Sequence, residues 1–75
     1  MNQIQTRLQD AMLGSAIDNA IKKLPQDYTI NIVLEAGSVG VVLYDLRGNE
    51  CDFDTAGVNA YEYINDAVKF AEASQ

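Results

Sequence analysis

The chain has 75 residues, 48% of them hydrophobic, with a single cysteine and no histidine, so we expect one small globular domain over residues 1–75 without an intramolecular disulfide. Its net charge of −6 and its pI near 4.1 oppose direct contact with nucleic acid or anionic membranes, because binding to those surfaces relies on Lys and Arg. One small core supplies only a few kcal/mol of stability, so help from a partner or a second copy is expected.

The first predicted element is a helix over residues 3–24. Apolar residues recur there at spacings of three and four and fall on one helical face: Ile4, Leu8, Met12, Ala16, Ile17, Ala20, Ile21 and Leu24. Lys22 and Lys23 suit the negative end of the helix dipole, and Pro25 cannot continue the helix. Gly14 weakens the middle, so one bent helix and two short helices both fit the sequence.

A β-hairpin is predicted next, because the apolar period changes from helical to two. The first strand covers residues 28–35, Ala36 to Ser38 form a short turn, and the second strand ends at Tyr44. The residues on the core side of this hairpin are Tyr28, Ile30, Ile32, Leu34, Val39, Val41 and Leu43. A second turn follows over residues 45–48, with Asp first and Gly fourth, which is the pattern of a type I turn with a bulge.

The return strand is predicted over residues 50–53. Its alternation points Cys51 and Phe53 inward. The residues that must then point outward together are Glu50, Asp52 and Asp54. These three carboxylates are therefore expected to share one side of the chain.

The last predicted element is a helix over residues 56–73, for which Asp54 or Thr55 is a suitable N-cap. Its core stripe consists of Tyr61, Ile64, Val68 and Ala71, flanked by Ala60 and Ala67. Tyr63 and Phe70 fall further round and widen the apolar arc beyond what a surface helix needs. We therefore expect something to cover the far edge of this helix.

The order of elements is helix, strand, strand, strand, helix. Short connections force neighbouring strands to be antiparallel, and this grouping of helices and strands indicates an α+β domain. We predict a three-stranded antiparallel β-meander (αβββα) with the N-terminal and C-terminal helices packed on one face. The other face would carry an apolar patch of Val33, Val42 and Tyr44, rimmed by carboxylates.

Few side chains could carry chemistry. Without histidine, general acid–base catalysis needs a buried carboxyl or amine. Cys51 points inward with no neighbouring base, so it is interpreted as a structural residue. Asp52 and Asp54 lie about 6.8 Å apart at a rise of 3.4 Å per residue, but their spacing does not match a calcium-binding loop. We expect no catalytic residue, no cofactor and no metal, and hence no enzyme.

The remaining feature of the sequence is a group of Asp and Glu residues close to Tyr and Phe residues in the C-terminal half of the chain. Seven of the eleven acidic residues lie in the last 31 positions, where only Arg47 and Lys69 oppose them. Carboxylates at regular intervals can imitate the charge of a nucleic-acid backbone, and Tyr and Phe are enriched at interfaces. The residues predicted to contact a partner are Tyr44, Asp45, Glu50, Asp52, Asp54, Tyr63, Asp66 and Phe70. The alternative is a solvated acidic face that keeps an edge strand from aggregating.

The acidic strand Cys51-Asp52-Phe53-Asp54-Thr55, which leads directly into the helical segment from Val58 to Ala73, resembles a feature of small inhibitor proteins. Phages and mobile elements encode these acidic proteins, anti-CRISPR proteins among them, against host nucleases. The resemblance is one of size, charge and layout and assigns no individual residue a role. It implies tight binding to a basic surface of a nucleic-acid-handling complex of the host, without chemistry.

Three functions follow from these observations. The first is a cytoplasmic inhibitor of a basic, nucleic-acid-binding protein. The cytoplasm is expected because Cys51 is the one cysteine and because the polar N-terminus is unlike a signal peptide. The second is a homo-oligomer that buries Tyr63, Phe70 or the patch of Val33, Val42 and Tyr44 against a second copy. The third is a metal-dependent enzyme that uses Asp52 and Asp54, which the composition disfavours.

Overall fold

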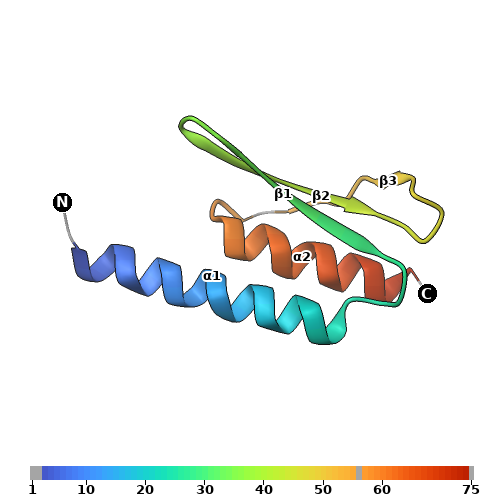
Figure 1. The fold of residues 1–75 in the computed structure, drawn as a ribbon, viewed down its shortest axis with the longest axis horizontal. Coiled ribbons are helices and arrows are strands. Elements are labelled where there is room, and N and C mark those ends of the chain that lie inside the picture. Colours follow the sequence, from blue (N-terminus) through green and yellow to red (C-terminus); the bar gives the residue numbers. More distant parts are fainter. Residues whose placement is uncertain (1–2, 56, 75) are drawn as a thin grey trace.

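The computed structural model of the chain describes residues 3–55 and 57–74, with side chains from residue 11 onward. Its elements are α1 (Gln3–Lys23), β1 (Thr29–Glu35), β2 (Ser38–Tyr44), β3 (Glu50–Cys51) and α2 (Ala60–Ala73). This arrangement confirms the predicted α+β fold with a three-stranded antiparallel sheet. Both helices lie on one face of the sheet (Figure 1), with α2 against β2 and α1 against α2. Neither helix has, within the described residues, the length and apolar character needed to cross a membrane.

Helix α1 is a single helix that runs through Gly14. It ends where predicted, with Lys22 and Lys23 in its last turn and the buried Pro25 after it. Its first turns extend past the start of α2 (Figure 1). The predicted core positions Ile4 and Leu8 lie outside the described side chains. A Cβ at Gly14 would meet nothing within 4 Å, so close packing is not the reason for glycine there.

The two helices pack through small side chains. Ala16 and Ala20 of α1 are buried against α2. The larger apolar residues beside them remain exposed, among them Met12, Ile17 and Ile21, of which Ile21 is 75% exposed. The buried stripe of α1 is therefore narrower than the sequence predicted, because the alanines make the contact and hold the isoleucines at its margins.

The hairpin register places Ile30 opposite Leu43 and Ile32 opposite Val41 on the helix side of the sheet. Its connection is Ala36 and Gly37, with Gly37 at a φ of 81°, a left-handed conformation that glycine adopts at little cost. The two paired strands are continuous through all seven residues of each. The predicted pairing and the predicted inward face are both present.

Burial along this hairpin falls toward its tip. Leu43 is fully buried, whereas Ile32, Leu34 and Val39 are exposed, Leu34 by 75%. The tip lies past the first turn of α2 (Figure 1). The prediction that these three residues belong to the core was wrong, because α2 begins short of the tip and the hairpin diverges from α1 (Figure 1).

Strand β3 is also shorter than predicted, covering Glu50–Cys51 rather than residues 50–53. The chain leaves β2 because Phe53 turns toward the core, where its ring centroid lies 6.4 Å from that of Phe70. The in-out alternation nevertheless continues beyond the ladder, with Asp52 exposed and Phe53 half-buried. The turn before β3 forms where predicted, closed by a hydrogen bond from the Gly48 N–H to the carbonyl of Asp45 at 2.9 Å.

Helix α2 begins at Ala60 with Asn59 as its N-cap, so the predicted start at residue 56 and the predicted cap at Asp54 or Thr55 were wrong. The carboxylate of Glu62 accepts the backbone N–H of Asn59 at 3.2 Å. Asn followed three residues later by Glu is a helix-start pattern. The observed cap lies four residues after Thr55, and the helix begins four residues after the predicted start.

The sheet-facing core is centred on three fully enclosed residues, Leu43 of β2 and Ala67 and Ala71 of α2. Leu43 rests on the two alanines, while Phe53 and Cys51 pack at the side. The small side chains bring α2 close to the strand. No space remains there for a longer side chain, since protein interiors are close-packed.

Replacing Ala67 with Leu should destabilise the fold by about 1–3 kcal/mol, because the added atoms overpack the contact with Leu43. Urea unfolding measures the change. Ala73→Leu, at an exposed position of the same helix, is the control and should stay within about 0.5 kcal/mol of the wild type. Equal effects of the two substitutions would contradict the packing described here.

Gly14→Ala should raise the free energy of unfolding by about 1 kcal/mol, since alanine is the better helix former and the site is open. The matched variant is Gly57→Ala, whose Cβ would lie 2.5 Å from the Cβ of Glu62 and should destabilise the protein. Thermal or urea unfolding compares the pair. A loss of stability in Gly14→Ala would mean that α1 bends at this position.

Candidate acidic interaction surface

An acidic segment follows β3 and runs along one edge of the sheet. Glu50 lies opposite Tyr44 in the ladder between β2 and β3, and Asp52 and Asp54 follow at alternate positions. All three carboxylates are exposed. The intervening Phe53 faces the core, which fixes the direction of its neighbours. We refer to Glu50, Asp52 and Asp54 as the acidic edge.

The carboxylate of Asp45, a predicted site residue, shapes the preceding turn. Its Oδ1 accepts the N–H of Arg47 at 2.8 Å and the N–H of Asn49 at 3.0 Å. These bonds hold the chain in the turn that returns it antiparallel to β2. Asp45 therefore positions the acidic edge, and its charge lies at the start of that edge.

Two further acidic residues also have structural partners. Asp66 accepts a hydrogen bond from the Thr55 hydroxyl, whose oxygen in turn accepts the N–H of Gly57 at 3.1 Å. Glu62 accepts the N–H groups of Val58 and Asn59. Both carboxylates tie the loop before α2 to that helix. Among residues 11–55 and 57–74, no comparable hydrogen bond engages the carboxylates of the acidic edge.

The predicted aromatic anchors take different places. Tyr44 is half-buried beside Glu50 on the face of the sheet away from the helices. Tyr63 of α2 helps to line a groove of about 320 Å³, which Glu50 and Asp52 also line together with residues of β2. Phe70 packs on Phe53 and is 36% exposed. The structure thus brings the two tyrosines beside the acidic edge, whereas the partly exposed Phe70 supports that edge through its contact with Phe53.

Cys51 is the lone thiol and is half-buried between two acidic side chains. Burial raises the pKa of the Cys51 thiol, and the negative charges of Asp45 and Asp52 raise it further, against a backbone hydrogen bond at Asp45 that lowers it. The Sγ atom lies 3.8 Å from the carbonyl oxygen of Asn49. A thiol with a raised pKa carries little thiolate at neutral pH and is a weak nucleophile.

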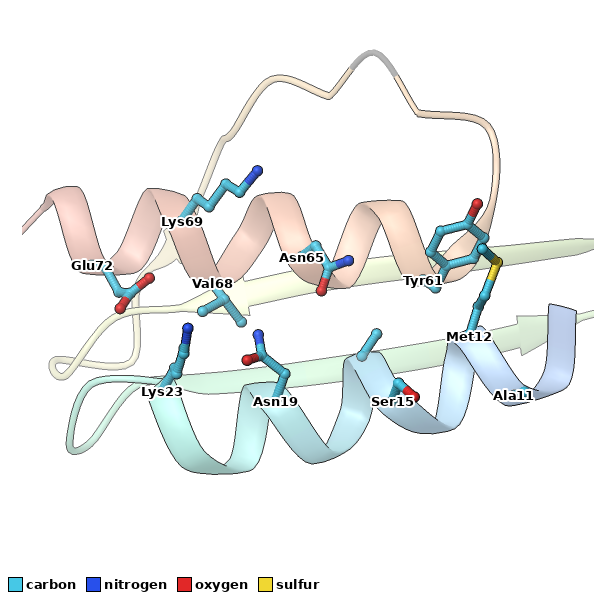
Figure 2. A pocket seen from close by; sticks show the side chains of 11 residues that line it. Ala11, Met12, Ser15, Asn19, Lys23, Tyr61, Asn65, Val68, Lys69 and Glu72 are labelled. Carbon is cyan, nitrogen blue, oxygen red and sulfur yellow. The ribbon is translucent and has the colours of Figure 1, made fainter. Parts of the chain in front are cut away.

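A second groove, of about 590 Å³, follows the seam between α1 and α2. Figure 2 shows Met12 and Tyr61 at one end of it and Lys23 and Glu72 at the other. Lys69 also lines this groove, so its charge is mixed, in contrast to the acidic edge. No polar or charged side chain described by the structure is buried, so this groove offers solvated groups and no sequestered one.

Side chains that commonly bind metals do not gather in threes anywhere in the described part of the chain. Asp52 and Asp54 share one side of the segment but have no third ligand beside them. The acidic edge therefore provides negative potential along a line.

Comparisons with known proteins provide no evidence on the function of this chain. No protein family, no curated protein and no solved structure matches the chain.

The N-cap at Asn59 was readable in the sequence but was missed. Asn59 and Glu62 have the spacing of a capping box, while Asp54 and Thr55 are cap residues by type alone. The hydrogen bond between Thr55 and Asp66 had no such local signal, because eleven residues separate the two.

Asp52→Asn should increase the reactivity of Cys51, because removing a neighbouring negative charge lowers the thiol pKa. At pH 8 we expect the rate of alkylation by iodoacetamide to rise about twofold or more. Asp18→Asn, on the exposed side of α1, is the control and should leave the rate unchanged. The same rate in Asp52→Asn and the wild type would contradict the electrostatic contribution of Asp52.

Proposed function

We propose that this chain is a non-enzymatic acidic binding protein that inhibits a basic, nucleic-acid-binding protein or complex of a host by occupying its binding surface. The observation that carries this proposal is the acidic edge, in which three exposed carboxylates stand at alternate positions of β3 and of the segment that follows it. Other acidic side chains nearby hold turns and caps. The acidic edge itself is left for contact with something outside the chain.

The spacing of the acidic edge suits a surface that binds a nucleic-acid backbone. Alternate residues of an extended chain lie about 6.8 Å apart, while one strand of duplex DNA carries a charge about every 3.4 Å along the axis. The edge thus presents roughly half the charge density of a single strand. A groove lined with Lys and Arg would attract it, and such complementarity accelerates association.

Apolar anchors beside the acidic edge would supply the affinity that exposed charges lack. Exposed ion pairs each contribute only about 0.2–1 kcal/mol, whereas aromatic side chains dominate many interfaces. Tyr44 and Tyr63 are both half-buried next to Glu50. Their fixed positions reduce the entropy lost on binding. Asp45, Asp66 and Phe70 contribute by holding the segment in shape.

The layout also supports a place among the small acidic inhibitors of phages and mobile elements. These proteins act by binding alone, and the described residues of this chain contain no buried titratable cluster. The host partner would be found in the cytoplasm, where nucleic-acid-handling complexes of bacteria act. A solvated face without a partner is the competing interpretation, and the following experiment separates the two.

The triple variant Glu50→Gln, Asp52→Asn, Asp54→Asn removes the charge of the acidic edge while keeping its shape. Immobilised wild-type protein should retain nucleic-acid-binding proteins from nuclease-treated host lysate, and the triple variant should not. With the purified captured protein, the triple variant should bind at least about tenfold more weakly, corresponding to about 0.5 kcal/mol for each charge. The wild-type affinity should fall with added salt.

The matched control carries the same loss of three charges elsewhere, at Asp18, Asp27 and Glu72, each replaced by its amide. It should behave as the wild type, because these residues lie outside the acidic edge. Equal affinity of the wild type and the acidic-edge variant would overturn the proposed function. Equal weakening by both triple variants would show that only net charge matters.

A further inference from the structure

The edge of β1 that faces away from β2 has no neighbouring strand among the described residues. β1 is seven residues long, contains no proline and carries one charge, Glu35, at its last position. Exposed edge strands are normally protected by lysines, prolines, bulges or short length. β1 has none of these protections, so its free edge is open to strand addition.

An apolar groove of about 330 Å³ lies beside this free edge, between α1 and β1. Every residue that lines it is uncharged. Ile21 of α1 and Ile32 of β1 flank it and are 75% and 41% exposed. Covering apolar surface stabilises a protein by about 25 cal/mol per Å². The side chains of this groove remain exposed in a single copy, so covering them would add stability.

The hairpin connection determines which backbone groups of β1 point to the free edge. In a two-residue hairpin the residues flanking the connection, Glu35 and Ser38, form a hydrogen-bonded pair. Alternate residues back from Glu35 therefore bond to β2. The N–H and C=O groups of Ile30, Ile32 and Leu34 point outward. An added strand must pair with these three residues.

We propose that a second copy of this chain adds here, β1 to β1 and antiparallel, about a two-fold axis through Ile32. Ile32 is the midpoint of Thr29–Glu35. In this register Ile32 faces Ile32 of the second copy, and Ile30 faces Leu34. The outward backbone groups of both strands are then paired, and the two sheets join into one sheet of six strands.

The side chains of β1 favour a second copy over a foreign strand. Each helix-side pair in this register is apolar against apolar, and the two grooves meet across the axis with α1 of both copies on one side of the joined sheet. Glu35 faces Thr29 of the second copy. The two Glu35 residues lie about 20 Å apart, beyond the Debye length of about 8 Å at physiological ionic strength, so the strand does not repel itself.

This interface differs from the surfaces that the sequence indicated for a second copy. Tyr63, Phe70, Val42 and Tyr44 lie outside both β1 and the groove, and Val33 lies on the face of β1 away from the helices. The acidic edge lies at the opposite side of the sheet from β1. The inference therefore does not depend on the proposed function, and either can fail alone.

Cysteine cross-linking tests the register. In a Cys51→Ala background, Ile32→Cys would place two Cα atoms about 5.5 Å apart, as in any hydrogen-bonded antiparallel pair, within the range that a disulfide spans. Leu34→Cys is the matched control, because its two copies would lie about 14 Å apart. Mild oxidation should give a covalent dimer with Ile32→Cys and none with Leu34→Cys. Cross-linking of Leu34→Cys at an equal or greater rate would overturn the proposed register.

Light scattering during size-exclusion chromatography tests the association itself. The wild type should move from 8.2 kDa toward twice that mass as concentration rises. Ile21→Lys changes an exposed side chain and should leave the far-ultraviolet circular dichroism spectrum unchanged while weakening the dimer at least about tenfold. Val58→Lys, also exposed but outside the groove, should remain dimeric. A wild type that stays at 8.2 kDa up to millimolar concentration would overturn the proposal.

Discussion

The contact of α2 with β2 is the interaction on which the rest of the structure depends. Leu43 lies on Ala67 and Ala71 without exposed surface, and α1 is attached to the opposite side of the same helix through Ala16 and Ala20. α2 thus contacts both β2 and α1, through Ala67 and Ala71 toward Leu43 and through Ile64 and Val68 toward the alanines of α1. The small alanine side chains let the helices and the sheet approach closely, so that few large side chains are buried between them.

The same helix also orders the acidic half of the chain. Through Glu62 it fixes the loop that precedes it, and through Asp66 it holds Thr55. Phe53 packs against Phe70, and this inward position of Phe53 directs its neighbours Asp52 and Asp54 outward. The surplus of negative charge therefore divides into carboxylates that stabilise the fold and carboxylates that face solvent in a fixed array. Composition alone does not distinguish the two groups.

Periodicity was sufficient to predict the order and type of the five elements, because apolar residues recur at spacings of three and four in the helices and at alternate positions in the strands. Alternation even placed Phe53 inward beyond the end of β3. Relative lengths were not readable in the same way. Fourteen helical residues span about 21 Å, and seven strand residues span about 24 Å, so a small offset leaves Leu34 uncovered. The Asn59 cap, in contrast, has a local signal in Glu62 three residues later, whereas the bond between Thr55 and Asp66 depends on the tertiary fold.

The two sides of the sheet differ in a way that bears on higher assembly. One side ends in the regular β1, whose one charge is Glu35 at its last position, while the other ends in the short β3 and a run with a carboxylate at every second position. Like charges directly opposite each other on paired strands are destabilising. Edge-to-edge addition of another strand is therefore disfavoured at the acidic side of the sheet. Each copy then has one edge strand available for pairing, so association through β1 would end once that edge is paired. The proposed two-fold pairing would use the β1 edge of both copies, so it would close at a pair and would not continue into a fibre.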